Sequence, residues 1–160
     1  MQRAKPTAAQ IKAVRAVLYK RARLQRIVAD LRSIDVLMNF DNPSVAGVAP
    51  SWFLEATGDL TTGVKEAANR CKRIGSAYRE MSRELAAVRI PAADRADLRL
   101  ALTEQAIVWE RRGAIWAEDS APDATAAAAE LKSHLMSAVR AAARVAPYLR
   151  QGNQLADLLR

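Results

Sequence analysis

The chain has little of the chemistry from which most active sites and metal sites are built. It contains one cysteine and one histidine among 160 residues. One cysteine excludes a disulfide framework and a cysteine-based zinc site, because both need several thiols. One histidine removes most histidine-based metal centres and catalytic triads. The sequence therefore predicts a protein that binds no metal, uses no cofactor and is not an enzyme.

Long uncharged segments are also lacking. The uncharged stretch from Asn42 to Leu54 is too short for a membrane-spanning helix and contains two prolines. The start, Met1 to Pro6, is charged, and lysines and arginines interrupt the sequence that follows, so the apolar region of a signal peptide is missing. We expect a cytoplasmic protein without a transmembrane segment. A chain from which a signal or an anchor had been trimmed would look identical.

Glycine and proline are scarce, at six each, while 51% of the residues are hydrophobic and 26% are charged. This balance is typical of a globular protein and excludes collagen-like, low-complexity and disordered classes. The length is close to that of one average domain with a core of its own. We therefore expect a single domain over residues 1–160.

The pattern of apolar residues is helical throughout. A first helix is expected over residues 7–39, because Thr7 and Gln10 have the spacing of a capping box and Val17, Leu24 and Leu31 recur behind them. A second helix is expected over residues 60–89. Its apolar residues form two columns with a seven-residue repeat: Val64, Cys71, Tyr78 and Leu85 in one, and Ala67, Ile74, Met81 and Val88 in the other.

Two prolines mark the starts of the next helices. Pro91 and Pro122 suit the first turn of helices over residues 91–119 and 121–149, and Pro147 should break the end of the latter. A short helix is expected over residues 154–160. Tight connections make such helices antiparallel neighbours, so the sequence predicts an all-α, up-down antiparallel four-helix bundle with one long connection between the first two helices. The expected buried residues are Ile74, Met81, Leu85, Leu131 and Leu135.

The net charge of +8 is concentrated near the N-terminus, where residues 1–40 hold nine basic residues against Asp30 and Asp35, a net of +7. On a helical wheel the basic side chains gather opposite the apolar stripe. The candidates for binding a polyanion are Lys12, Arg15, Tyr19, Lys20, Arg23 and Arg26. Such a face suits the phosphate backbone of a nucleic acid or an anionic surface. The alternative is a solvated face, or one paired with the acidic residues Glu104, Glu110 and Glu118 of the third helix.

The third helix has more apolar surface than one core face needs. Its apolar residues come in triplets, at residues 100–102, 107–109 and 114–116, and three consecutive positions cover about 200° of a helix. Either this helix is unusually buried or it contacts a partner. The interface candidates are Leu102, Trp109 and Trp116, together with Trp52 and Phe53 of the long connection.

Two isolated residues have simple structural interpretations. Glu130 and His134 share a helix face, but one such pair lacks the repeated Glu-x-x-His pattern of di-iron bundles, so His134 is expected to be a half-buried or surface residue. Cys71 lies in an apolar column and is expected to be a small buried side chain.

These observations favour a non-enzymatic helical-bundle interaction protein that self-associates as a homodimer or a higher oligomer, or binds another protein. The alternative is a basic accessory subunit that binds nucleic acid or another polyanion along the first helix. A third hypothesis is a carrier or sensor of an apolar ligand, because the alanine-rich fourth helix could leave space between helices.

Overall fold

The computed structural model describes residues 3–41, 60–117 and 124–150, and every regular element within these ranges is helical. The expected all-α fold is confirmed for this part of the chain. The long helices are α2 (Arg21–Asp41), α4 (Leu60–Leu85), α5 (Ala92–Ala117) and α6 (Ala124–Arg144). A short helix, α1 (Ala8–Leu18), precedes them, and a single 3-10 turn, η2 (Ala146–Tyr148), follows them. The expected helix over residues 154–160 lies outside the described residues.

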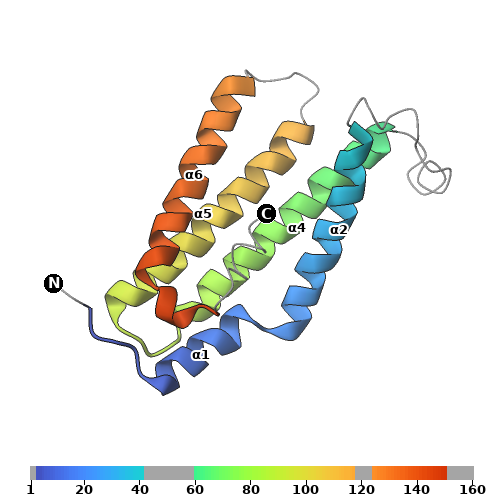
Figure 1. Ribbon diagram of the computed structural model, residues 1–160. Coiled ribbons are helices and arrows are strands. Elements are labelled where there is room, and N and C mark those ends of the chain that lie inside the picture. Colours follow the sequence, from blue (N-terminus) through green and yellow to red (C-terminus); the bar gives the residue numbers. More distant parts are fainter. Residues whose placement is uncertain (1–2, 42–59, 118–123, 151–160) are drawn as a thin grey trace.

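The helix predicted over residues 7–39 is two helices, so this prediction was wrong. The capping box is confirmed, because Thr7 Oγ1 accepts a hydrogen bond from Gln10 N–H and Gln10 Oε1 accepts one from Thr7 N–H. The chain then leaves the helical path after Leu18, and α1 lies across the foot of the longer helices (Figure 1). No glycine or proline marks the break. It coincides with tertiary contacts, since Arg23 Nη1 donates to Val17 O near the end of α1 and the Tyr19 ring is buried.

The long helices pack mainly in chain order. Helix α4 contacts α2 on one side and α5 on the other, and α5 contacts α6. The four helices stand side by side, with α2 and α6 at opposite edges (Figure 1). Helix lengths differ from those expected, because α6 ends at Arg144 and η2 contains Pro147. The closed four-helix bundle, its up-down topology and the single-domain boundary remain predictions.

Helices α4 and α5 approach each other closely at two glycines. A Cβ atom on Gly75 would lie 2.9 Å from Glu110 Cγ and 3.1 Å from Ala106 O. A Cβ atom on Gly113 would lie 2.9 Å from Ala68 O. Because the contact at Gly113 is with backbone, any larger residue there would push the two helices apart.

The hydrophobic core lies mainly between α4 and α5, closed at the foot by α1, the start of α2 and η2. Of the five residues expected in the core, Ile74, Met81 and Leu85 are buried, as predicted. Leu131 and Leu135 are only half-buried, which corrects the prediction for these two positions. The physical reason is the position of α6, whose main neighbour among the long helices is α5 alone.

Candidate binding surfaces

The basic residues expected to bind a polyanion divide into two groups in the structure. Lys12, Lys20 and Arg26 are exposed, whereas Arg15 is partly buried and Tyr19 and Arg23 are buried. The expectation that Arg23 lies on the outer face was wrong, since this side chain is 2% exposed. We call the six candidates, Lys12, Arg15, Tyr19, Lys20, Arg23 and Arg26, the basic stripe. Only part of the basic stripe is therefore exposed.

Several members of the stripe connect helices. Arg15 Nε and Nη2 donate to the backbone oxygens of Tyr148 and Leu149, at 3.1 and 3.0 Å, which ties α1 to the segment after α6. The Tyr19 hydroxyl accepts a hydrogen bond from Arg150 N–H, and the Arg150 guanidinium lies 4.3 Å from the centre of the Tyr19 ring. These contacts hold α1 against the C-terminal end of the described chain.

Lys20, Arg23 and Arg26 pair with acidic residues of α4. Arg23 Nη2 lies 2.6 Å from Glu84 Oε1, and its Nε lies 3.4 Å from Glu80 Oε2. Lys20 lies 3.8 Å from Glu84, and Arg26 lies 3.5 Å from Glu80. The basic stripe thus has acidic partners, but they belong to α4 rather than to the third predicted helix, where they were expected.

The acidic residues of α5 have other partners. Glu110 binds Arg79 of α4 through two hydrogen bonds, at 2.5 and 2.9 Å, and Glu104 Oε2 lies 2.5 Å from Nδ1 of His134 on α6. The third expected acid, Glu118, lies outside the described residues. His134 is half-buried, in agreement with the sequence-based interpretation.

A hollow of about 350 Å³ lies between α2 and α4, at a place that the sequence pattern did not indicate. It was not predicted because it requires the register of two helices that are far apart in the sequence. We call it the α2–α4 hollow. Its lining residues are Arg26, Ile27, Ala29 and Asp30 of α2, and Arg70, Arg73, Ser76, Ala77 and Glu80 of α4.

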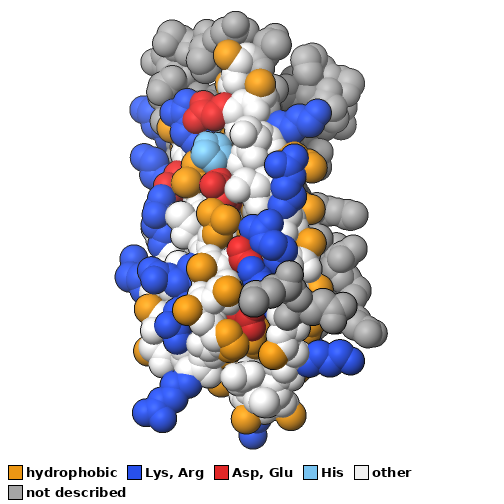
Figure 2. Space-filling model, turned by 90° about the vertical axis from the view of Figure 1, so that its left-hand side faces the viewer, with side chains coloured by type: hydrophobic (Ala, Val, Ile, Leu, Met, Phe, Trp, Pro, Cys, Tyr) orange, Lys and Arg blue, Asp and Glu red, His pale blue; other side chains and the backbone are white. Residues whose placement is uncertain are grey.

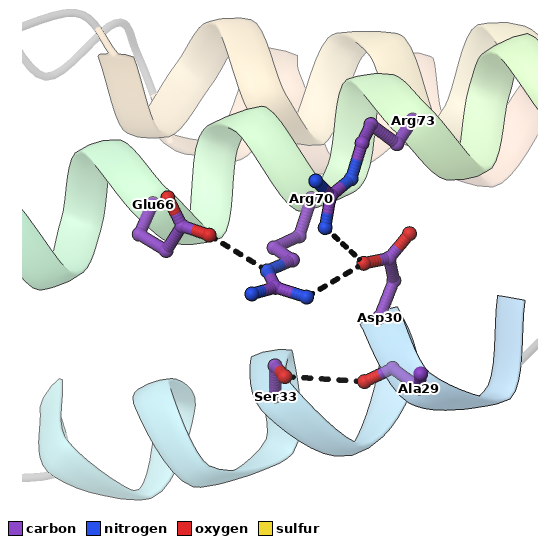
Figure 3. Close-up of polar contacts among 6 residues, drawn as sticks. All are labelled: Ala29, Asp30, Ser33, Glu66, Arg70 and Arg73. Atoms are coloured by element: carbon purple, nitrogen blue, oxygen red, sulfur yellow. Dashed lines mark hydrogen bonds and ion pairs between the residues drawn. The ribbon is translucent and has the colours of Figure 1, made fainter. Parts of the chain in front are cut away.

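Asp30 is the charged centre of this hollow and is 6% exposed. Its Oδ1 atom accepts hydrogen bonds from Arg70 Nη1, at 2.9 Å, and from Arg73 Nη2, at 2.6 Å (Figure 3). Arg70 also donates from Nε to Glu66, and its pairing with Asp30 is the largest cause that raises the pKa of its guanidinium. The hollow is therefore a place where arginines from α4 converge on a buried carboxylate of α2.

Two interface candidates on the third predicted helix are internal. Leu102 and Trp109 of α5 are buried in the core, so their side chains are unavailable to a partner. The burial of Ala101, Leu102, Val108 and Trp109 is explained by the position of α5, which packs against both α4 and α6. The side chains of Trp116, Trp52 and Phe53 lie outside the described residues.

Helix α6 carries an exposed apolar surface that the sequence analysis did not select. Met136 and Val139 are 40% and 46% exposed, and Leu100 of the neighbouring α5 is also exposed. On this side of the molecule, Lys and Arg side chains border a region with interspersed hydrophobic side chains (Figure 2). The signal was present in the sequence. This helix has two apolar columns with a seven-residue repeat, one through Leu131 and Ala138 and the other through Leu135 and Ala142, and Met136 and Val139 fall outside both.

Helix α5 also carries polar groups that are buried. The side-chain amide of Gln105 and the indole N–H of Trp109 are buried and have no hydrogen-bond partner among the described residues. The Arg112 guanidinium lies 4.8 Å from the Trp109 ring centre, and burial lowers its pKa. Burial raises the pKa of the Cys71 thiol to about 11, so the thiol is not ionised near neutral pH.

No cluster of three or more potential metal ligands occurs within the parts of the chain that the structure describes. None of the described helices is both long enough and apolar enough to cross a membrane. Comparisons with protein-family models, with curated proteins and with solved structures give no match for this chain.

Proposed function

We propose that the protein is a non-enzymatic helical interaction protein that forms a homodimer through the outer face of α6. The observation that carries this proposal is the exposure of Met136 and Val139 on a helix whose main long-helix neighbour is α5 alone. Neighbouring apolar side chains that remain in water on an edge helix are typical of an interaction site. The same proposal includes the antiparallel up-down order of the long helices, supported by their packing in chain order.

The sequence of α6 suits pairing with a second copy of itself. Lys132, Met136, Val139 and Ala143 are exposed and follow helical spacing, so they lie in one line that we call the α6 stripe. If two α6 helices pair antiparallel about a twofold axis between residues 137 and 138, Met136 of one copy faces Val139 of the other. Lys132 then faces Ala143 rather than another lysine. This register buries both apolar residues without opposing like charges.

Sedimentation equilibrium of the wild-type protein and two variants tests the proposal. Val139→Glu places a charge in the α6 stripe and should convert the dimer to a monomer, because a desolvated and unpaired carboxylate is costly in an interface. Val28→Glu is the matched control, since Val28 is an exposed valine of α2. It should leave the dimer intact. A wild-type protein that is monomeric at high micromolar concentration would contradict the proposal, and so would a Val139→Glu dimer as stable as the wild type.

A second candidate function, polyanion binding, is favoured by the exposed positions of Lys12, Lys20 and Arg26. About three phosphate contacts would give a log–log salt dependence with a slope near −2.7 on duplex DNA. The combined change of Lys12→Glu and Arg26→Glu should abolish binding and preserve the helical circular dichroism spectrum, because both side chains are solvated. If wild-type protein binds neither DNA, RNA nor anionic vesicles at low salt, this second function is excluded.

A further inference from the structure

The α2–α4 hollow has the size and the mixed character of a small-molecule site. Its volume of about 350 Å³ falls at the lower end of the range of ligand pockets. Small side chains make the space, since Ala29, Ser76 and Ala77 are positions where a larger residue would project into it. The lining thus combines the apolar side chains of Ile27, Ala29 and Ala77 with three arginines and two carboxylates.

Two of these arginines have unused hydrogen-bonding capacity. Within the described part of the chain, Arg73 makes one hydrogen bond, from Nη2 to Asp30, although a guanidinium has five N–H donors. Arg26 makes one long contact, from Nη2 to Glu80 Oε2 at 3.5 Å. Their side chains are 58% and 65% exposed, and they come from opposite walls of the hollow, α4 and α2.

Asp30 fixes the position of this pair. Its carboxylate is buried and pairs with both Arg70 and Arg73, so the Arg73 head is held at the hollow instead of moving freely in solvent (Figure 3). Glu80 in turn is shared between Arg23 and Arg26, at 3.4 and 3.5 Å, and neither contact is short. An anion that binds Arg26 and Arg73 therefore competes with the 3.5 Å contact between Arg26 and Glu80 and with the one hydrogen bond from Arg73 to Asp30.

From this arrangement we infer that the α2–α4 hollow binds a small amphiphilic anion, whose carboxylate or phosphate group is held between Arg26 and Arg73 and whose apolar body lies on Ala29 and Ala77. Arginine forks recognise planar carboxylates and phosphate oxygens through paired hydrogen bonds. The apolar lining residues favour a ligand with a hydrocarbon or aromatic body over a simple inorganic ion. This site is separate from the α6 stripe and does not depend on dimer formation.

Isothermal titration calorimetry on the full chain, with phenyl phosphate, benzoate and inorganic phosphate as probes, tests this inference. Phenyl phosphate or benzoate should bind with one site per chain, and the stronger of the two identifies the preferred anionic group. Inorganic phosphate should bind more weakly than phenyl phosphate because it has no apolar body. If phenyl phosphate and benzoate give no heat of binding at millimolar concentration, the inference is overturned.

Variants separate a ligand site from an array of ion pairs that only joins α2 to α4. Ala29→Phe fills the hollow and keeps every arginine, and Ala29 is exposed, so the variant should fold and lose binding. Arg26→Ala and Arg73→Ala should each weaken binding about tenfold or more, by loss of charge-assisted hydrogen bonds. Arg32→Ala is the control, since Arg32 is an exposed arginine of α2 outside the hollow, and it should bind like the wild type. Binding that survives Ala29→Phe would contradict the inference.

Discussion

The buried side chain of Arg23 connects three helices and offers the sharpest test of the structure. It donates from Nη1 to Val17 O at 3.1 Å and lies 2.6 Å from Glu84 and 3.4 Å from Glu80. The guanidinium thus ties the end of α1, the start of α2 and the end of α4 together. The hydrogen bond between Arg23 and Glu84 is also the largest cause that lowers the pKa of the Glu84 carboxyl.

Replacing Arg23 with alanine should destabilise the protein by about 2–3 kcal/mol. Removing one partner of a fully buried ion pair costs about 3–5 kcal/mol, because the other charge is left without compensation. Glu80 and Glu84 are each about 40% exposed, so water can solvate both carboxylates after the substitution and the cost falls below that range. The substitution also removes the hydrogen bond to Val17 O and the packing of the side chain, so its cost in free energy of unfolding stays well above that of losing a surface ion pair.

Urea denaturation followed by circular dichroism measures this effect, and Arg26→Ala is the matched control. Arg26 is also an arginine of α2 that pairs with Glu80, but it is 65% exposed, so its removal should cost about 0–1 kcal/mol. Arg23→Lys should restore little of the lost stability, since an ammonium group cannot make the forked contacts. If Arg23→Ala and Arg26→Ala have equal free energies of unfolding, the assigned burial of Arg23 is refuted.

Three further outcomes follow from burial and charge. Leu135→Ala should lower the free energy of unfolding by about 1–2 kcal/mol, and Leu85→Ala by about 2–5 kcal/mol, because only Leu85 is fully buried. Equal losses of stability in urea denaturation would show that the Leu135 side chain is as buried as that of Leu85. The thiol of Cys71, whose pKa burial raises to about 11, should react with a thiol reagent only when the protein unfolds, and rapid labelling of native protein would contradict its burial. Arg144 lowers the pKa of Asp97 in the folded protein below its ordinary value of 3.8. The ionised Asp97 therefore stabilises the fold at pH values above 3.8, and this stabilisation is lost as the pH falls through the lowered pKa of the folded state. The melting temperature of Asp97→Asn should therefore lie below that of wild type at neutral pH and approach it in acid; a constant difference would argue against this ion pair.

The sequence predicted the helices whose packing repeats locally. Ile74, Met81 and Leu85 are buried because their seven-residue columns face a neighbour along the whole helix, and this pattern needs no knowledge of the rest of the fold. The seven-residue pattern could not predict that α6 lies at the edge of the row of long helices. Leu135 has the same spacing, but it is only half-buried, because burial depends on how many helices cover the column.

The pairing of charged side chains from different helices could not be predicted from the sequence. The basic residues of the first helix were candidates for binding a polyanion, and the alternative was a solvated face or pairing with acids such as Glu104 and Glu110. These two acids bind His134 and Arg79 instead. Which acid faces which arginine depends on the register between helices, and side-chain spacing within one helix contains no information about it. For the same reason the α2–α4 hollow could be found only in the structure.

Disulfide cross-linking of two variants that each carry one introduced cysteine tests the proposed dimer most directly. The Met136→Cys and Val139→Cys proteins are mixed in equal amounts and oxidised, and the wild-type protein, whose only cysteine is the buried Cys71, is the control. An antiparallel α6 pair places residue 136 of one copy opposite residue 139 of the other, within the reach of a disulfide bond. The mixed disulfide dimer should exceed each homodimer by far more than the twofold ratio that random pairing of equal amounts gives, and wild type should form no cross-linked dimer. If no mixed dimer forms, or if its excess over each homodimer is only about twofold, the α6 stripe is not the interface between two copies in this register.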